Sequence, residues 1–447
     1  MTAELAAQET VAPKLWRNSG FMVFWSARTI SYAGTGVTMV VLPVLAYRLT
    51  GSPAATASLA AIEVVPYLAL GLFAGALADR VNQRKVMALS DAASALLLGS
   101  IPAAAVLHLL VAPQLFVVAL GVATTFVWFD AASFGAVPAL VNRSQLPAAT
   151  SMVWSSGSIA MLIGPALGAG LITVLAPAYV LGLDAASYAA SALLITAIRR
   201  HFQRSPRGPG RNSRVRQDIA DGLRFLCRQP VVRTMTIATF AICVSWGGTF
   251  GLLVVYANRA LHLVRTDVRL GLLYSAGELG GLISAIAVPR IVKLSIIGRL
   301  MAAFMLANTV ILAILAIVPG YGWALLLFTC YELSYGLVIM VAITVRQLLT
   351  PDHLQGRVNT TGRLIAWSGQ PAGALLGGML AELMPIRLVF GLMTLGVAGG
   401  AGLAVWSCLR AGPLSRISIS GQADEPPSPP APPPPSASAP SASPPRH

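Results

Sequence analysis

Ionisable side chains inside long apolar segments are the residues of this sequence best placed to do chemistry. Of the 447 residues, 56% are hydrophobic and only 11% are charged. A charge near the centre of a bilayer costs about 2.5–3.5 kcal/mol on the insertion scale, so a side chain that persists there is a functional candidate. Five such residues fall well inside apolar blocks: Arg28, Glu63, Asp130, Glu278 and Glu332.

Three further acids, Asp91, Asp184 and Glu382, lie nearer the ends of their blocks, where they are expected to reach water. For Asp184 a packing or topological role is favoured over a functional one. Glu63 and Glu278 are compatible with two roles. Each either serves the function directly or is a neutral, hydrogen-bonded acid that fixes its helix to a neighbour.

The elements that hold these side chains are apolar blocks of about 20 residues or more, long enough to cross a hydrocarbon layer roughly 30 Å thick. Lipid leaves no water for unpaired backbone groups, and continuous apolar runs favour helices over a barrel. The sequence therefore predicts an all-α membrane protein of twelve transmembrane helices in two six-helix halves. The blocks lie near 21–47, 55–78, 86–107, 114–138, 146–175, 178–198, 231–257, 268–290, 296–318, 321–348, 356–383 and 387–409.

The formal charge of +15 reflects membrane topology rather than nucleic-acid binding. The basic residues lie in short loops between the apolar blocks and form no basic face interleaved with aromatic residues. With the N-terminus inside, most of the 31 basic residues fall on one side. By the positive-inside rule, both termini of this multi-pass protein are expected in the cytoplasm. The basic residues on the other side are Arg48, Arg259, Arg265, Arg269 and Arg387.

Composition divides the chain into five expected segments. Between the halves, an arginine-rich stretch contains Ile219, Leu223 and Leu226 at helical spacing, which predicts an amphipathic helix at the membrane surface. Beyond the second half the chain is rich in Pro, Ser and Ala and cannot form a packed core, which predicts disorder. The segments are a cytoplasmic N-terminal segment (1–20), the first half (21–198), a basic linker (199–230), the second half (231–410) and a cytoplasmic tail (411–447).

The loop GALADRVNQRK, from Gly75 to Lys85, joins the second and third blocks. It resembles the signature loop of the major facilitator superfamily, in which a glycine precedes an aspartate–arginine pair and a basic cluster. The resemblance implies a gating loop in which Asp79 latches the first half against the second in the outward-open state. The corresponding loop of the second half has Pro289 where an aspartate is expected, so it departs from the pattern. The gating-loop candidates are Gly75, Asp79, Arg80, Arg84 and Lys85.

The fifth block contains GSIAMLIGPALGAG, which resembles the glycine–proline signature of proton-driven antiporters in the same superfamily. Proline frees a backbone carbonyl and permits a kink, and Gly168 and Gly170 are expected to allow close packing against the other half. The residues of this signature are Gly157, Gly164, Pro165, Gly168 and Gly170. Three other stretches are similar to the efflux branch that contains macrolide and siderophore exporters: FWSARTISYAGTG, FDAASFGAVPALVNRSQLPAAT and GLDAASYAASALL.

In this superfamily the first, fourth, seventh and tenth helices line a central cavity, which makes Arg28, Asp130 and Glu332 candidates for proton coupling. Arg28 and Asp130 lie about eight residues from the same end of their helices, roughly 12 Å deep at about 1.5 Å per residue. We expect these two to form a buried ion pair and Asp130 and Glu332 to share the proton traffic. A static pair that only fixes packing is the alternative. The candidates for stacking on a substrate are aromatic: Trp25, Phe129, Trp246 and Tyr335.

These features predict a proton-coupled antiporter that exports a small amphipathic organic compound, such as an antibiotic or another secondary metabolite. Export of a siderophore, or a membrane sensor that binds without transporting, are the alternatives. An enzyme is not expected, because the five histidines show no metal-ligand spacing and no nucleotide-binding loop is present. No cofactor or metal is expected. The expected partners are a small-molecule substrate, protons and the lipid bilayer of a bacterial inner membrane, for a chain that acts as a monomer.

Overall fold

The computed structural model describes residues 15–78, 81–142, 145–198, 215–264, 267–291, 297–351 and 354–411. The remaining parts of the predicted N-terminal segment, linker and tail lie outside the described residues. Within the described residues the protein is all-helical, and eleven helices are long and apolar enough to cross a membrane. The predicted fold class is therefore confirmed. Two of the twelve predicted segments are each divided into two helices, and in one of them neither part is long enough to count as a membrane span.

The first half contains six long helices preceded by a short 3-10 helix, Leu15–Arg17. The side chain of Asn18 caps the first of them by accepting a hydrogen bond from the backbone N–H of Phe21 at 3.2 Å. Gly51, with φ of 64°, ends the same helix in the left-handed conformation that glycine adopts without strain. The six helices are α1 (Ser19–Thr50), α2 (Pro53–Ala78), α3 (Gln83–Val106), α4 (Ala112–Leu140), α5 (Leu146–Val174) and α6 (Pro177–Ala197).

The second half contains eight helices, because two of the predicted segments are broken. The predicted helix 356–383 is divided at Ser368, where Pro371 has no backbone N–H to offer the carbonyl of Trp367. The predicted helix 231–257 is divided at Leu252. The helices are α8 (Pro230–Gly251), α9 (Leu253–Arg259), α10 (Val268–Ile291), α11 (Ile297–Ile317), α12 (Tyr321–Leu349), α13 (Gln355–Trp367), α14 (Gly369–Leu383) and α15 (Ile386–Ala411).

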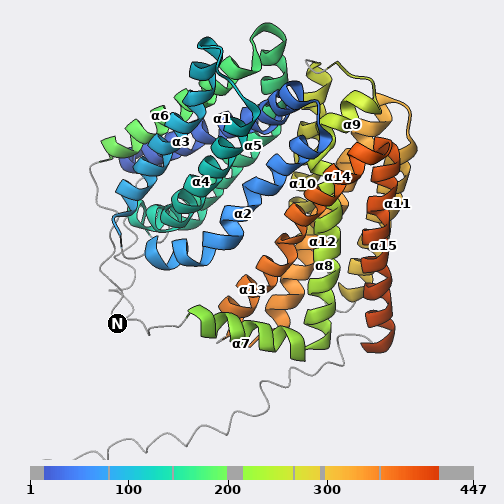
Figure 1. Ribbon diagram of the computed structural model, residues 1–447. Helices are drawn as coiled ribbons and strands as arrows, with labels where there is room; N and C mark the ends of the chain where they lie inside the picture. Colours follow the sequence, from blue (N-terminus) through green and yellow to red (C-terminus); the bar gives the residue numbers. More distant parts are fainter. Residues whose placement is uncertain are drawn as a thin grey trace, which may run out of the picture.

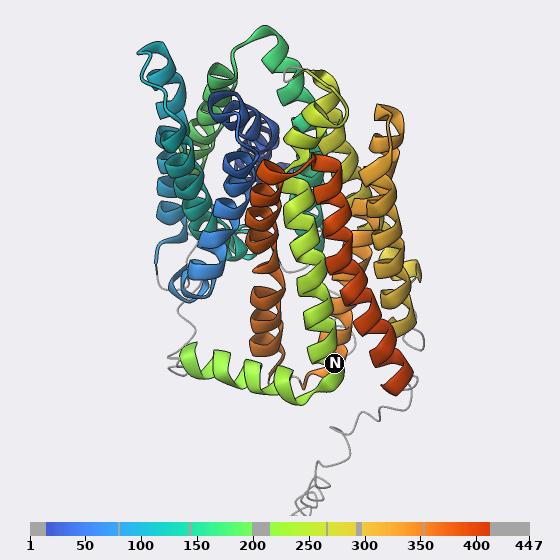
Figure 2. The same cartoon turned by 45° about the vertical axis from the view of Figure 1, so that its right-hand side comes forward.

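A helix in the predicted linker, α7 (Val215–Arg228), crosses one end of the second half (Figures 1 and 2). Asp221 forms a salt bridge of 2.9 Å with Arg357 of α13. Leu226 is buried in a cluster with Val232 and Val358. This part of the amphipathic face therefore packs on protein rather than on lipid. The side chain of Ile219 lies outside the described residues.

The two halves touch at the end of the bundle opposite α7, called here the contact end, and diverge toward the α7 end (Figure 1). At the contact end, Arg259 donates hydrogen bonds to the Tyr47 hydroxyl at 3.3 Å and to the carbonyl of Ala381 at 3.0 Å. Ser52 donates a short hydrogen bond to Glu382, which lies near the end of its helix as predicted. These contacts join α1 and the turn between α1 and α2 of the first half to α9 and α14 of the second.

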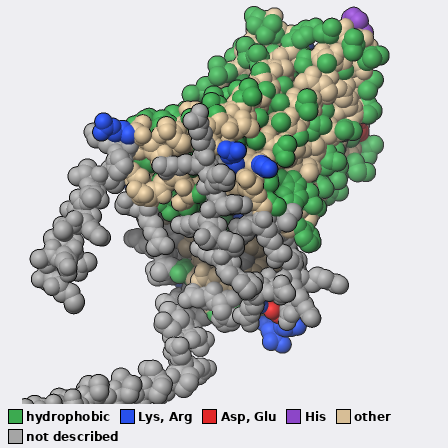
Figure 3. All heavy atoms as spheres, turned by 90° about the vertical axis from the view of Figure 1, so that its left-hand side faces the viewer, with side chains coloured by type: hydrophobic (Ala, Val, Ile, Leu, Met, Phe, Trp, Pro, Cys, Tyr) green, Lys and Arg blue, Asp and Glu red, His purple; other side chains and the backbone are tan. Residues whose placement is uncertain are grey.

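The outer face of the first half is covered largely by hydrophobic side chains and shows few charges (Figure 3). Leu89, Leu96 and Leu193 on this half are 69%, 77% and 71% exposed. Large apolar side chains at such exposure are unfavourable in water and are expected where lipid is the solvent.

Candidate functional site

The side chain of Arg28 lies in the interior of the first half and is only 6% exposed. Its Nη2 atom donates a hydrogen bond of 2.5 Å to the hydroxyl of Tyr32, one turn along α1. Its guanidinium also lies over two aromatic rings, 4.4 Å from the centroid of Tyr32 and 4.7 Å from that of Phe129. Aromatic faces attract a cation most strongly when it is desolvated, so these rings stabilise the buried charge.

Asp130 of α4 is the carboxylate next to Arg28, at a nearest N–O distance of 3.8 Å. At that distance the two side chains form an ion pair but no hydrogen bond. The Asp130 side chain is 29% exposed, against 7% for that of Arg28, so the pair is less buried than the sequence suggested. Asp130 is also within electrostatic reach of Arg363, on α13 of the other half. It can therefore interact with charges in both halves.

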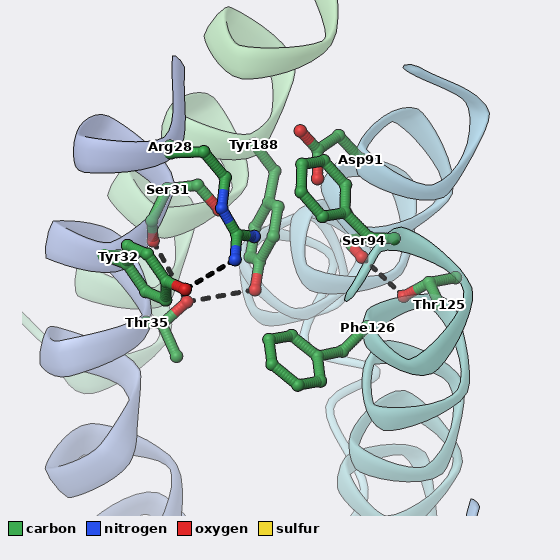
Figure 4. A pocket seen from close by; sticks show the side chains of 10 residues that line it. Arg28, Ser31, Tyr32, Thr35, Asp91, Ser94, Thr125, Phe126 and Tyr188 are labelled. Atoms are coloured by element: carbon green, nitrogen blue, oxygen red, sulfur yellow. Dashed lines mark hydrogen bonds between the residues drawn. The ribbon is translucent and has the colours of Figure 1, made fainter. Parts of the chain in front are cut away.

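Arg28 lines a pocket of polar and aromatic side chains, most of which were not singled out from the sequence (Figure 4). Thr35 and Tyr188 share a hydrogen bond of 3.0 Å on one side of it, and Ser94 and Thr125 share one of 2.6 Å on the other. Ten residues from α1, α3, α4 and α6 line it: Arg28, Ser31, Tyr32, Thr35, Asp91, Ser94, Thr125, Phe126, Phe129 and Tyr188.

Asp91 and Asp184 do not reach water, contrary to the prediction. They are 2% and 1% exposed. Asp184 accepts hydrogen bonds from Thr38 at 2.5 Å and Ser187 at 2.9 Å, which fits the packing role favoured for it. Position along a helix misled the prediction because both acids lie on the buried faces of α3 and α6, whose opposite faces carry the exposed Leu89, Leu96 and Leu193. The sequence that follows Asp184, AASYAAS, contains hydroxyl side chains at helical spacing. These were the available signal that the acid is buried and hydrogen-bonded.

Glu332 of α12 is the buried acid of the second half, at 8% exposure. The indole Nε1 of Trp246 donates to both of its carboxylate oxygens, at 2.9 and 3.0 Å. Trp246 in turn stacks between Phe250 and Tyr335, with ring centroids 4.6 and 5.5 Å away. Two predicted stacking residues and the predicted acid thus form one cluster, which Phe250 extends.

The other two predicted stacking residues lie elsewhere. Phe129 is 3% exposed and packs in the core of the first half beneath Arg28. Trp25 donates a hydrogen bond of 3.1 Å to Ser156 and meets Trp16 edge to face. The four aromatic candidates therefore do not form one surface. Those on the first half support Arg28 and α5, and those on the second surround Glu332.

The glycine–proline helix packs differently from the prediction. A Cβ atom added to Gly164 would lie 2.6 Å from the Cα of Gly36, and one added to Gly168 would lie 2.8 Å from the carbonyl oxygen of Val37. Both glycines therefore face α1 of their own half, and an added Cβ on Gly170 meets nothing within 4 Å. The expected contact of Gly168 and Gly170 with the other half is wrong. Gly164 and Gly168 are four residues apart and therefore share one face of α5, whereas Gly170, two residues farther along, points in a different direction.

The adjacent face of α5 makes the contact between the halves. A Cβ added to Gly271 of α10 would lie 2.3 Å from the carbonyl oxygen of Pro165 and 2.5 Å from the Cβ of Ala169. Gly157, the first glycine of the signature, approaches the ring of Tyr32. Of the gating-loop candidates, Asp79 and Arg80 lie outside the described residues, and the surroundings of Gly75, near the end of α2, are not described either. Arg84 and Lys85 lie in the first turn of α3, and Arg84 donates a 2.6 Å hydrogen bond to the carbonyl of Ile198.

Two helical halves that meet at one end, each with charged groups in its interior, define the architecture of a secondary transporter. The chain belongs to the Major Facilitator Superfamily, whose family model matches residues 24–371. Proteins of this superfamily with this fold are transporters of small molecules and not enzymes, as was predicted.

Two curated relatives are efflux proteins. The multidrug efflux pump Tap of Mycolicibacterium fortuitum is 26% identical over 379 residues, which cover 83% of this chain and 90% of the pump. The enterobactin exporter EntS of Escherichia coli O81 (strain ED1a) is 24% identical over 391 residues, which cover 84% of this chain and 90% of the exporter. The predicted resemblance to the efflux branch is confirmed.

Solved structures support the fold. A bacterial homologue of the human lysosomal transporter Spinster, in an inward-facing and occupied conformation, has a TM-score of 0.70 at 12% identity and covers 89% of this chain and 97% of its own. The nucleoside transporter NupG has a TM-score of 0.72 at 12% identity and covers 87% of this chain and 98% of its own.

Proposed function

We propose that this transporter is a proton-coupled antiporter that exports a small amphipathic organic compound by alternating access. The similarity to Tap, a multidrug efflux pump, and to EntS, an enterobactin exporter, supports the outward direction. The fold supports a mechanism in which one half rocks against the other about a central site.

The observation that supports proton coupling concerns two interior acids, Asp130 and Glu332, one in each half. Neither accepts a hydrogen bond from a positively charged side chain among the described residues. Asp130 has an arginine beside it that hydrogen-bonds to a tyrosine instead. Glu332 is held by an indole N–H, and no salt bridge to it exists among the described residues. A carboxylate in low dielectric without a firm counter-ion favours its neutral, protonated form. Both acids are therefore suited to bind a proton in one state and release it in another.

The proposed orientation places the α7 end in the cytoplasm of a bacterial cell and the contact end outside, with both termini cytoplasmic. The excess of basic residues at the α7 end supports it. In this orientation the described conformation is inward-facing, since the halves touch at the contact end and diverge at the other. Substrate would enter from the cytoplasm, and protons would enter from outside after the halves rock. The protein is proposed to act as a monomer.

Transport by purified protein in liposomes tests this proposal. An imposed pH difference should drive uptake of an exported compound against its gradient, with a matching proton flux. Asp130→Asn and Glu332→Gln should each abolish the response to the pH difference while leaving folded protein. Asp267→Asn, which alters an acid paired with Arg269 in the loop before α10, is the matched control. If the two interior variants still transport against the gradient as the natural protein does, proton coupling through these acids is refuted.

A siderophore-like metal chelator is a second candidate substrate, favoured by the similarity to EntS over most of both chains. Transport assays in the same liposomes distinguish this substrate from an amphipathic drug-like compound. If this candidate holds, enterobactin would be transported in preference to uncharged or cationic amphipathic compounds.

A further inference from the structure

The pocket beside Arg28 contains a second acid that the proposed function does not use. Arg28 enters this pocket from α1, and Asp91 enters it from α3 (Figure 4). Asp91 is 2% exposed, and Arg28 is the one basic residue among the ten that line the pocket. Asp130 is not among those ten, although it lies 3.8 Å from Arg28. Arg28 therefore has one carboxylate inside the pocket and another outside it.

Arg28 and Asp91 each have a buried polar atom that makes no hydrogen bond. These atoms are Nε of Arg28 and Oδ2 of Asp91, and neither has a partner among the described residues. Hydroxyl groups elsewhere in the pocket are paired with each other, as in Thr35–Tyr188 and Ser94–Thr125. A buried donor and a buried acceptor left unpaired cost free energy. The pocket has room for about one water molecule, which can accept from Arg28 and donate to Asp91.

A single arginine can balance only one of the two carboxylates beside it. If Asp91 and Asp130 were both ionised, one buried negative charge would have no counter-ion, which low dielectric strongly disfavours. If both were protonated, the buried guanidinium would have no counter-ion. The balanced arrangement therefore has one acid ionised and the other protonated.

The other titratable groups near Asp91 leave this balance unchanged. Asp184 has hydroxyl donors of its own, Thr38 and Ser187, and does not compete for Arg28. The side chains that α4 contributes to the pocket do not titrate. Tyrosine hydroxyls are neutral at physiological pH. The titratable or charged groups that face Asp91 are Arg28 and Tyr32 of α1 and Asp184 and Tyr188 of α6.

We propose that Asp91 is a second proton-binding acid of the first half, which shares the fixed charge of Arg28 with Asp130. Arg28 stays in place, held by the Tyr32 hydroxyl and the ring of Phe129. In the described conformation Asp130, which is beside Arg28 and partly exposed, is ionised, and Asp91 is protonated. A proton then passes from Asp91 through water in the pocket to Asp130. One O–H bond breaks and one forms, so the net charge around Arg28 does not change.

This inference rests on the proposed proton coupling and deepens it. Asp130, whose side chain is 29% exposed, exchanges protons with the space between the halves. Asp91 holds a proton in the interior of the first half, away from that space. Asp91 is thus a positioning residue, because it acts on Asp130 through the charge balance at Arg28.

Infrared difference spectroscopy of the full-length protein in lipid nanodiscs tests the shared charge without requiring transport. The carbonyl stretch of a protonated carboxyl group is separate from the bands of a carboxylate. At neutral pH the natural protein should show a band of this kind that is absent from Asp91→Asn. The band should also be lost in Asp130→Asn, because Asp91 is then the acid that must balance Arg28. Asp184→Asn, the same change at an equally buried acid, should retain it.

A band that survives Asp91→Asn, or one that persists in Asp130→Asn, would overturn the proposal. Thermal unfolding in the same nanodiscs checks the folding of each variant. If Asp91→Asn does not fold, Asp130→Asn decides alone, since the band of the natural protein must then disappear.

Transport in liposomes separates this outcome from that of the export proposal. Asp91→Asn should reduce transport driven by a pH difference at least tenfold, and Asp184→Asn should not. Loss of the band in Asp130→Asn, together with transport by the natural protein that ignores the pH difference, would refute coupled export and leave the shared charge standing. Transport that follows the pH difference in the natural protein, with a band unchanged in both Asp91→Asn and Asp130→Asn, would do the reverse.

Discussion

The Nη2 atom of Arg28 lies 3.8 Å from the nearer carboxylate oxygen of Asp130, farther than the 2.5 Å that separates it from the Tyr32 hydroxyl. The arginine is thus held by its own helix, and the carboxylate on α4 has a charge beside it without a fixed bond. Such an arrangement permits Asp130 to change its protonation or its partner without displacing Arg28.

Arg28→Ala should therefore destabilise the protein more than Asp130→Asn. Removing one member of a buried pair typically costs about 3–5 kcal/mol, and the arginine variant leaves a carboxylate without a partner. Asp130→Asn leaves Arg28 with Tyr32 and two aromatic rings and should cost less. Thermal unfolding in detergent measures both. The double variant should be more stable than the sum of the single effects predicts, and additive effects would mean that the two residues do not interact.

The helices could be predicted from the sequence because lipid imposes a strict rule on the backbone. Every predicted segment coincides with a helix or a pair of consecutive helices, and the ends of α5 and α10 agree within one residue. Depth could be predicted as well, since counting along α1 and α4 brought Arg28 and Asp130 together. The break at Ser368 was missed, although Pro371 provided a local signal.

Helix rotation could not be predicted, and the errors at the site follow from this. In a lipid-embedded bundle, apolar side chains occur on all sides of a helix, so composition does not reveal which face is buried against which neighbour. Gly168 was thus assigned to the wrong partner. Asp91 was expected to reach water, and Thr35 and Tyr188 were missed, because their grouping depends on how α1, α3 and α6 are rotated.

Asp79→Asn should preserve expression and substrate binding but slow transport several-fold. The position of Asp79 in the signature loop predicts that it stabilises the outward-open state, and the amide removes its charge. Transport rate at matched protein level in liposomes checks this. Asp267→Asn, a change of the same kind near the contact end, serves as control. An unchanged rate for Asp79→Asn would indicate a surface charge without a role in gating.

The proposed topology predicts the side on which reporters fused to the chain will be found. A reporter fused after Pro209 or at the C-terminus should be cytoplasmic, and one inserted near Thr266 should be external, because basic residues favour the cytoplasmic side. Paired alkaline phosphatase and green fluorescent protein fusions measure this. The threading of twelve segments would be wrong if the linker and the Thr266 loop reported the same side.

The loop before α10 should be insensitive to pH over the physiological range. Hydrogen bonds from Arg269, at 2.9 and 2.6 Å to one carboxylate oxygen, lower the pKa of Asp267 below its ordinary value. A lowered pKa stabilises the folded protein above the unfolded value of about 3.9, and this is lost only as the pH falls through the lower folded value. The small difference in unfolding temperature between Asp267→Asn and the natural protein should stay constant from pH 5 to 8. A difference that disappears between pH 7 and 5 would contradict the assignment.

Gly271→Val should shift the protein away from the conformation described here. A Cβ at this position would lie 2.3 Å from the carbonyl oxygen of Pro165, and both atoms belong to helix interiors that cannot yield cheaply. The contact end should therefore open. Spin labels at Leu49 and Leu383, in a cysteine-free background, should report a longer distance between these two positions than in the unsubstituted protein. The transport rate should also be lower. Gly170→Ala is the matched control, because its added Cβ meets nothing within 4 Å. An unchanged distance in Gly271→Val would mean that this contact does not hold the halves together.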